Sequence, residues 1–249
     1  MEGFIIMSNR VAIVTGGSRG IGAAIAEALA KDGYDIAISY SSSSGAAEKV
    51  AEKIRALGRK ALTIKANGTS VEGNREVIAE TMVAFGRIDA LVCNAGTYPY
   101  GPIDEMTVAQ IDNILNLNVR AVMVETMEAV KHMKEGGRII YIGSAFGARA
   151  PFPGISLYAA TKAALRGFAK GVARDLGSRG ITANVIEPGP IHTDMNPEDG
   201  EGAALISSFV ATGTYGKVDD IASMAAFLAS PKASYITGAA LPVDGGLEA

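Results

Sequence analysis

The sequence predicts an α/β fold of the Rossmann type, in which helices cover both faces of a doubly wound, parallel, seven-stranded sheet. Three observations predict it. Short apolar runs rich in β-branched residues alternate with helical patterns of roughly 10 to 20 residues. Glycine, at 30 of 249 residues, falls between those runs, and a glycine-rich turn joins the first run to the first helical pattern. Strands separated regularly by helices imply right-handed βαβ units within a single domain over residues 1–249.

The predicted strands are continuous apolar runs, as expected for strands buried on both faces. In chain order they are Val11–Thr15, Ile36–Tyr40, Ala61–Lys65, Ile88–Cys93, Arg138–Gly143, Ile181–Glu187 and Tyr235–Val243. In the first predicted helix, AAIAEALAKDG, apolar residues recur at the spacing of a helix. We expect this helix to end at Gly33, since glycine commonly terminates helices. The later helical patterns are Gly45–Leu57 with its charges on one face, Val71–Phe85, a region around Val108–Lys134, and Tyr158–Leu176.

Two segments fall outside this alternation. Proline, glycine, aspartate and threonine cluster between Pro188 and Gly216, and we expect residues 190–216 to form a lid over the substrate. Residues 1–7 are expected to be a flexible extension, with Met7 as an alternative start.

Composition excludes several classes of protein. The net charge of −3 argues against a nucleic-acid-binding surface. A single cysteine excludes a disulfide framework and a cysteine-based zinc cluster, and two histidines add little capacity for a metal. No apolar run approaches the roughly 18 residues that span a bilayer. The opening segment MEGFIIMSNR contains an apolar run that is too short for a signal peptide. We therefore expect a cytoplasmic protein with no membrane partner.

The segment Thr15-Gly-Gly-Ser-Arg-Gly-Ile-Gly22 follows the first strand and opens the first helix, which is the context of a dinucleotide-binding turn. Gly16 allows the tight turn, Gly20 lets the backbone approach a pyrophosphate, and Gly22 permits close packing of the helix on the strand. A plain glycine turn is the alternative. The cofactor-binding residues predicted from this segment are Gly16, Ser18, Arg19, Gly20, Ile21 and Gly22.

The end of the second strand indicates which dinucleotide is bound. A carboxylate that binds the ribose hydroxyls of NAD(H) is expected about 20 residues after the turn. The chain instead has Tyr40, Ser41 and Ser42, followed by two more serines. Hydroxyl groups, with Arg19 available, suit a 2′-phosphate that a carboxylate would repel, so NADP(H) is favoured over NAD(H). Capping of the next helix by Ser44 is a second use for this serine run.

Tyr158 and Lys162 are four residues apart on a predicted helix, which places them on one face. An ammonium group beside a phenol favours the phenolate, so we expect Lys162 to lower the pKa of Tyr158. A Tyr activated in this way suits hydride transfer to a ketone, which needs a proton donor at the developing alkoxide. An exposed amphipathic turn is the alternative for this pair taken alone.

Together with the glycine turn, Asn94-Ala95-Gly96 and Ser144, the pair resembles the short-chain dehydrogenase/reductase family, and the resemblance covers Val11 to Gly246. It implies that Ser144 holds the substrate carbonyl, that Tyr158 is the acid or base, and that Lys162 also binds the nicotinamide ribose. It also implies an asparagine that anchors a water in a proton relay. Asn118 is our choice for this role, and Asn116 is the competing candidate.

The same resemblance implies further cofactor contacts. Asn67 would lie beside the adenine ring, and the segment Pro188-Gly189-Pro190-Ile191 with Thr193 would enclose the nicotinamide carboxamide. In one departure, 14 positions separate Ser144 from Tyr158, one more than is commonest in the family, which should alter the pocket wall but not the chemistry.

Candidate substrate residues follow the predicted strands, at the edge where open α/β sheets bind ligands. They are Tyr98, Phe146, Phe152, His192 and Met195. Each could instead be an ordinary loop anchor.

The resemblance implies an NADPH-dependent oxidoreductase that reduces a ketone or aldehyde, near 3-oxoacyl carrier-protein reductases and naphthol reductases. An NAD-dependent alcohol or sugar dehydrogenase is one alternative. A protein that binds or sequesters a nucleotide such as cyclic di-GMP, with little turnover, is another, because the PGPIHTDMNPEDG loop is similar to that of a family member described in this way. We expect a homotetramer, with a dimer as the alternative.

Overall fold

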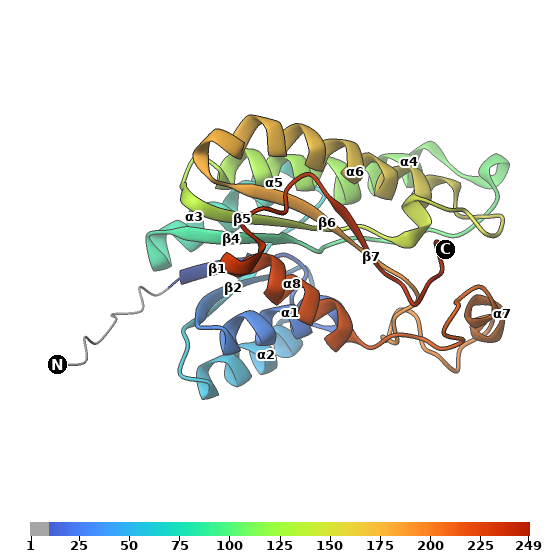
Figure 1. Cartoon of the computed structure of the whole chain (residues 1–249), viewed down its shortest axis with the longest axis horizontal. Helices are drawn as coiled ribbons and strands as arrows, with labels where there is room; N and C mark the ends of the chain where they lie inside the picture. The colour runs from blue at the N-terminus through green and yellow to red at the C-terminus, as the bar shows by residue number, and fades with distance from the viewer. Residues whose placement is uncertain (1–9) are drawn as a thin grey trace.

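Seven parallel strands form one sheet in the computed structural model, which describes residues 10–249 (Figure 1). The strands are Arg10–Val14 (β1), Tyr34–Tyr40 (β2), Ala61–Lys65 (β3), Ile88–Cys93 (β4), Met133–Ile142 (β5), Thr182–Pro188 (β6) and Ala240–Val243 (β7). Their order in the sheet is β3-β2-β1-β4-β5-β6-β7, so the direction of winding reverses between β1 and β4. This arrangement confirms the predicted Rossmann-type fold. The extension predicted for residues 1–7 lies outside the described residues.

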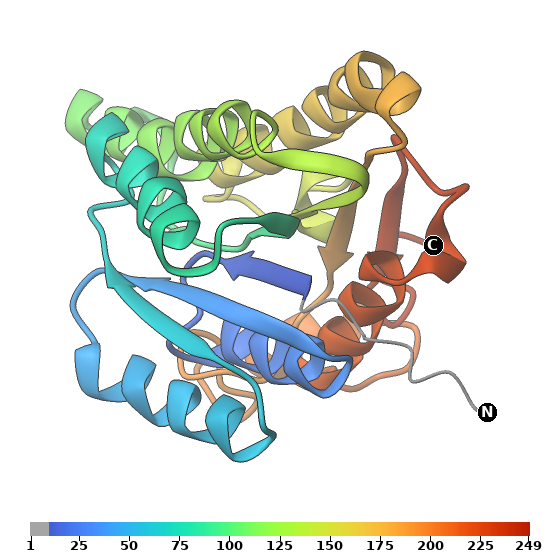
Figure 2. The ribbon, with the colours of Figure 1, turned by 90° about the vertical axis from the view of Figure 1, so that its left-hand side faces the viewer.

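Helices cover the sheet on both faces (Figures 1 and 2). The α-helices are Gly20–Lys31 (α1), Ser44–Ala56 (α2), Val71–Phe85 (α3), Val108–Leu115 (α4), Ala121–Ala129 (α5), Ser156–Leu176 (α6), Ala203–Ser208 (α7) and Val218–Ala229 (α8). Helices α1, α2 and α8 lie on one face and α3 to α6 on the other, while α7 stands away from both layers at one end of the sheet. Among residues 10–249, no helix is both long and apolar enough to cross a membrane.

Two apolar cores result from the alternation of side chains along the strands. Ala12 and Val14 of β1 pack with α1 and α8, whereas Ile13 between them packs with α3, α5 and α6 on the opposite face. The central strands therefore have apolar side chains on both faces, as their continuous apolar runs predict.

Two predicted elements differ from the structure. The last strand begins at Ala240 instead of Tyr235, because Pro231–Ala233 forms a short helical turn and Gly238 has a positive φ of 71°, which extended strands do not adopt. The helix predicted around Val108–Lys134 ends at Ala129, and β5 already begins at Met133.

The same predicted helix is also interrupted. A π-helical turn over Asn116–Arg120 separates α4 from α5. Such turns insert one extra residue into a helix and rotate the residues after the insertion, and they are frequent at functional sites. This turn contains Asn118.

Candidate active site

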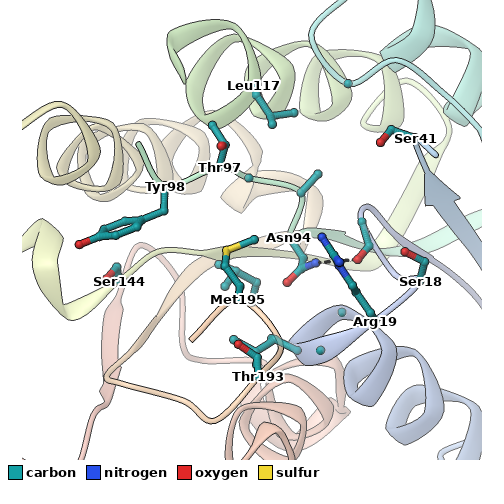
Figure 3. A pocket seen from close by; sticks show the side chains of 18 of the residues that line it. Ser18, Arg19, Ser41, Asn94, Thr97, Tyr98, Leu117, Ser144, Thr193 and Met195 are labelled. Carbon is teal, nitrogen blue, oxygen red and sulfur yellow. Dashed lines mark hydrogen bonds between the residues drawn. The ribbon is translucent and has the colours of Figure 1, made fainter. Parts of the chain in front are cut away.

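A cavity of about 530 Å³ opens at the carboxyl ends of the strands, beside the point where the winding reverses. Figure 3 shows Ser18, Arg19 and Ser41 around one end of it and Tyr98 and Ser144 around the other. Asn94, Thr193 and Met195 lie between these ends. Within the described residues, no group of three or more His, Cys, Asp or Glu side chains is placed to hold a metal ion.

The glycine turn forms the floor of the cavity between β1 and α1. Gly16 has a φ of 63°, which residues with a side chain rarely adopt. A Cβ atom at Gly22 would lie 2.5 Å from Asn94 Nδ2 and 2.6 Å from the Gly16 carbonyl oxygen, so the start of α1 has no room for a side chain there. Gly20, Ile21, Ser18 and Arg19 also line the cavity, and all of the residues predicted from this segment therefore lie together.

The end of β2 lines the cavity with hydroxyl groups. Tyr40, Ser41 and Ser42 all face it, and Asn67, from the loop after β3, lies in the same lining. Asn67 Oδ1 accepts hydrogen bonds from the backbone N–H and the hydroxyl of Thr69, at 3.1 and 2.8 Å. No carboxylate of the described chain lies among the lining residues from Ser39 to Asn74.

Asn94 connects the two halves of the sheet under the cavity. Its Nδ2 donates to the carbonyl oxygens of Thr15 and Gly16, at 3.0 and 3.2 Å. In return, Thr15 Oγ1 accepts from the backbone N–H groups of Asn94 and Ala95, at 3.1 and 3.2 Å. Ala95 and Gly96 continue the lining. These bonds hold the glycine turn against the end of β4.

Ser144, Tyr158 and Lys162 meet at the other end of the cavity. Ser144 follows β5, and its hydroxyl lies beside the Tyr158 phenol. Lys162, one helical turn after Tyr158 on α6, places its Nζ 5.5 Å from the centroid of the tyrosine ring. The Lys162 ammonium donates to the carbonyl oxygen of Ile142 at 2.8 Å. The three side chains thus gather beside the end of β5 and line one end of the cavity.

The pKa of Tyr158 differs in direction from the prediction. Burial raises the pKa of the phenol above its ordinary value of 10.0, and the neighbouring Ser144 hydroxyl opposes that rise in part. Lys162 is itself buried, which lowers its pKa to about 8. Desolvation therefore dominates both groups, and Tyr158 is a protonated phenol at neutral pH.

Ion pairs of Arg166 anchor α6. Arg166, one turn after Lys162, pairs with the fully buried Glu187 of β6 and with Glu248. The pairing ties the helix that carries Tyr158 to the neighbouring strand. Nothing in the local sequence signals that Glu187 lies beside Arg166, since the two residues are brought together only by the packing of α6 on β6.

Asn118 is buried and Asn116 is not, which separates the two candidates. Asn118 Oδ1 accepts from the backbone N–H of Thr97 at 2.9 Å, and its Nδ2 donates to the Thr97 carbonyl oxygen at 2.9 Å and to Thr161 Oγ1 at 3.2 Å. Its side chain thus joins the loop after β4 to α6. A Cβ atom at Gly96 would lie 3.3 Å from Asn118 Oδ1 and 3.7 Å from Lys162 Nζ.

The segment predicted as a lid leaves the end of β6 and returns before α8. Pro188, Gly189, Ile191 and Thr193 line the cavity at its start, and an isolated bridge pairs Ile191 with Gly216 at its close. Beyond the cavity, Val210 packs with Ala145 and the fully buried Leu247. The Thr212 backbone N–H also donates to the Gly245 carbonyl oxygen at 3.0 Å.

Of the five candidate substrate residues, Tyr98, Phe146 and Met195 line the cavity. The Tyr98 ring meets the Tyr158 ring edge to face, with centroids 4.7 Å apart, and burial raises the pKa of Tyr98 to about 12.

Phe152 and His192 do not line the cavity, and this corrects the prediction. Phe152 lies between Phe146 and Phe209, with ring centroids 5.3 and 6.3 Å away, so it supports the wall from behind. His192 bonds within the lid instead, where its Nδ1 accepts the backbone N–H of Glu198 at 3.2 Å. Both residues follow strand ends in the sequence, but packing within the loops turns their side chains away.

Several residues that line the cavity were not predicted from the sequence. Leu117, Ile206 and Glu125 contribute to the cavity. Leu117 and Glu125 lie inside a predicted helix, where the π-helical turn changes which side chains face the cavity, and Ile206 belongs to the lid.

Known proteins resemble this chain along almost its whole length. The sequence family described as enoyl-(acyl carrier protein) reductase matches residues 16–248. The cyclic-di-GMP-binding biofilm dispersal mediator protein of Escherichia coli is 39% identical over 245 residues, covering 97% of this chain and 98% of that protein. The hydroxynaphthalene reductase of Aspergillus fumigatus is 38% identical over 249 residues, covering 94% of this chain and 91% of the other.

Among solved structures, a short-chain dehydrogenase from Burkholderia cenocepacia in complex with NADP is 49% identical, with a TM-score of 0.95. The match covers 97% of this chain and 98% of that one. Sequence identity, whole-chain coverage and the shared sheet place this protein in the short-chain dehydrogenase/reductase family of oxidoreductases.

Proposed function

We propose that the protein is an NADPH-dependent reductase that converts a ketone or aldehyde into an alcohol. The observation that carries this proposal is the group of Tyr158 with the buried Ser144 and Lys162 at one end of a cavity whose other end is the glycine turn and the serine run. A carbonyl group held at Ser144 and Tyr158 would lie in the same cavity as the reactive end of a dinucleotide.

The cavity fits NADP(H). Its volume of about 530 Å³ is within the range of roughly 300–1,000 Å³ usual for cofactor sites. Gly16 and Gly22 leave the backbone free of side chains at the start of α1, where a helix N-terminus favours a phosphate group. Ser41, Ser42 and the exposed Arg19 offer hydrogen bonds and a positive charge to a 2′-phosphate.

Bound NADPH would supply the hydride to the carbonyl carbon. The protein's own residues would handle the proton: Tyr158 donates its phenolic proton to the carbonyl oxygen as the C–O double bond becomes single, and the Ser144 hydroxyl stabilises that oxygen. The raised pKa of Tyr158 favours this direction, because the phenol enters the reaction protonated. Lys162 places a positive charge near the phenolate that remains, and Asn118 holds the loop that faces Lys162.

The carbonyl substrate is proposed to be a 3-oxoacyl compound or an aromatic ketone. Tyr98 and Phe146 make the substrate end apolar, and Met195 adds an apolar side chain beside it, which suits either class. The relationship to a hydroxynaphthalene reductase supports the aromatic class.

The test is the loss of absorbance at 340 nm with NADPH and, separately, with NADH across 3-oxoacyl thioesters, diketones, quinones and aldehydes. We expect turnover with NADPH that collapses in Tyr158→Phe and persists in Tyr235→Phe, which removes a phenol that is fully exposed on the surface. Turnover that survives Tyr158→Phe would refute the assigned proton donor.

A second candidate is a nucleotide-binding protein with little turnover, which the relationship to the Escherichia coli cyclic-di-GMP-binding protein favours. NADPH binding without oxidation by any carbonyl compound in the panel, together with saturable binding of cyclic di-GMP, would support this candidate over the reductase.

We further propose that the protein is a homotetramer. Val108, Leu115, Met123 and Met127 are exposed apolar side chains on α4 and α5, and a subunit contact would remove them from water. Sedimentation that shows a monomer at micromolar concentration would refute this.

A further inference from the structure

Residues 244–248 follow β7 and lie behind one wall of the cavity, and we call this segment the clasp. Its Leu247 is fully buried, although the rest of the segment is polar or glycine. The Leu247 side chain packs with Ala145, the residue after Ser144, and with Val210 of the segment predicted as a lid. Three parts of the chain that lie far apart in the sequence therefore meet at one side chain.

A tight turn fixes the shape of the clasp. The two carboxylate oxygens of Asp244 accept the backbone N–H groups of Gly246 and Glu248, at 2.9 and 2.8 Å. Gly245 and Gly246 have positive φ values of 63° and 82°, which residues with a side chain rarely adopt. A Cβ atom at Gly245 would lie 2.7 Å from Val210 Cγ1, so the turn lies directly against the lid.

Hydrogen bonds attach the clasp on both sides. On the lid side, the backbone N–H of Thr212 donates to the carbonyl oxygen of Gly245 at 3.0 Å. On the other side, Nη1 of Arg149, from the loop after β5, donates to the carbonyl oxygen of Leu247 at 2.8 Å. The clasp thus joins the lid to the loop after β5 through backbone groups as well as through the Leu247 side chain.

The loop held in this way carries an aromatic wall of the cavity. Phe146 lines the cavity and packs against the cluster that contains Leu247. The Phe146 backbone N–H donates to Ser144 Oγ at 3.1 Å, so the ring and the serine belong to one turn. Phe152 contacts both Phe146 and Phe209, which brings an aromatic ring of the lid to the same wall.

The apolar cluster around Leu247 is separate from the two main cores, and Leu247 is the largest of its buried members. A void at Leu247 would therefore remove support from the lid and from the Phe146 turn together. The dinucleotide end of the cavity is held independently, because hydrogen bonds between Thr15 and Asn94 fix the glycine turn. Loss of the Leu247 side chain should thus disturb the carbonyl substrate and spare the dinucleotide.

We propose that the clasp determines substrate specificity, with Leu247 as a positioning residue that holds the Phe146 turn against the lid and so shapes the wall that a large substituent of the carbonyl substrate contacts. Leu247 acts through Phe146, since Leu247 itself does not line the cavity. This inference rests on the proposed function, because it concerns the carbonyl compound that the reductase would accept.

The first test compares two α-diketones that differ in one substituent, phenyl in phenylpropanedione and methyl in butanedione, with NADPH as the reductant. In Leu247→Ala, the ratio of kcat/KM for the phenyl compound to that for the methyl compound should fall about tenfold, mainly through KM. A change of this size is what small differences in the fit of an apolar pocket produce. Affinity for NADPH, followed by nucleotide fluorescence, should stay within about twofold of the wild type, since about 0.4 kcal/mol separates values that differ twofold.

Two further variants separate positioning from stability. Leu247→Met has a similar volume and should keep the ratio of the wild type. Leu228→Ala removes the same buried side chain from α8, in a core that does not line the cavity, and is the matched control. It should lower the stability of the protein without changing the ratio, whereas a merely structural role of Leu247 predicts the same ratio in all of these proteins.

Hydrogen exchange of the free full chain tests the clasp without turnover. In Leu247→Ala, backbone amides of residues 145–149 and 206–213 should exchange about tenfold faster than in the wild type, because both segments lose their shared support. In Leu228→Ala, neither segment should change. Faster exchange in only one of the two segments would contradict the joint support that the clasp is proposed to give.

An unchanged ratio of the two diketones in folded Leu247→Ala overturns the inference, and so does unchanged exchange. If Leu247→Ala does not fold, Arg149→Gln takes its place, because it removes the hydrogen bond to the Leu247 carbonyl oxygen at an exposed position. Wild-type values of both the ratio and the exchange in Arg149→Gln would then overturn the inference. Absence of turnover by the wild type with every carbonyl compound would refute the proposed function, whereas the exchange experiment would still decide whether the clasp holds the two segments.

Discussion

The stability of the free protein should depend on pH through Glu125. Burial raises the pKa of this carboxyl group from 4.5 to about 7. One pKa unit is worth about 1.4 kcal/mol, so the ionised group costs the folded state about 3 kcal/mol. Because the folded-state pKa is the higher one, the stabilisation is fully present below the unfolded value of 4.5 and is lost as the pH rises through about 7.

Glu125→Gln removes the titration while keeping the shape of the side chain. Relative to the wild type, its free energy of unfolding should rise by about 2–3 kcal/mol between pH 5 and pH 8.5. At pH 5, where the wild-type carboxyl group is almost fully protonated, the two proteins should agree in stability to within about 1 kcal/mol. The buried Lys162 also titrates in this range, but it is present in both proteins and cancels in the difference.

The assay is urea unfolding followed by circular dichroism at pH 5, 7 and 8.5, at one protein concentration and without nucleotide. Glu76→Gln serves as the control, because it removes an exposed carboxylate from the neighbouring helix α3. A difference between Glu125→Gln and the wild type that stays constant from pH 5 to pH 8.5 would refute the argument that burial governs this group.

Three other substitutions test the proton donor, the serine run and the wall of the lid. Tyr158→Phe should lower kcat for carbonyl reduction by about 100-fold or more while NADPH affinity, followed by nucleotide fluorescence, stays near that of the wild type; a matching loss of affinity would contradict the assignment. Ser41→Asp should lower the ratio of kcat/KM for NADPH to that for NADH at least about tenfold, because its carboxylate repels the 2′-phosphate, whereas Ser41→Asn should not. Leu247→Ala should cost about 2–5 kcal/mol by leaving a cavity beside Ala145 and Val210. Thermal unfolding measures that loss, and an unchanged Tm would contradict the packing described for the lid.

The sheet could be predicted because each strand carries its own signal. Apolar runs and glycine turns locate β1 to β6 to within a few residues, except for the early start of β5. The end of the chain was harder, since the apolar character of residues 235–239 hides a turn that depends on Gly238 and on the Asn184 side chain, which bonds Ile236 and Ala239.

The site was predictable where residue types are rare in combination, as with the glycine turn and the Tyr158–Lys162 pair. Two features depend on tertiary packing instead. Glu125 and Leu117 face the cavity because the π-helical turn that contains Asn118 changes which side of the helix faces it. No residue type in the sequence predicts that turn. The direction of the Tyr158 pKa depends on how deeply α6 and the Tyr98 ring bury the phenol, which sequence spacing does not contain.

The order of the strands has a consequence for how such proteins diversify. The glycine turn and the serine run belong to the segment that ends with β3, whereas Ser144, Tyr158 and the lid follow β4. The two segments are joined along β1 and β4, where Ala12–Val14 pairs with Ala90–Val92. A recombination crossover in the loop 66–70 would therefore transfer nucleotide preference between homologues as one unit. The compatibility of Thr15 with the Asn94–Ala95 turn would determine which parents yield a working chimera.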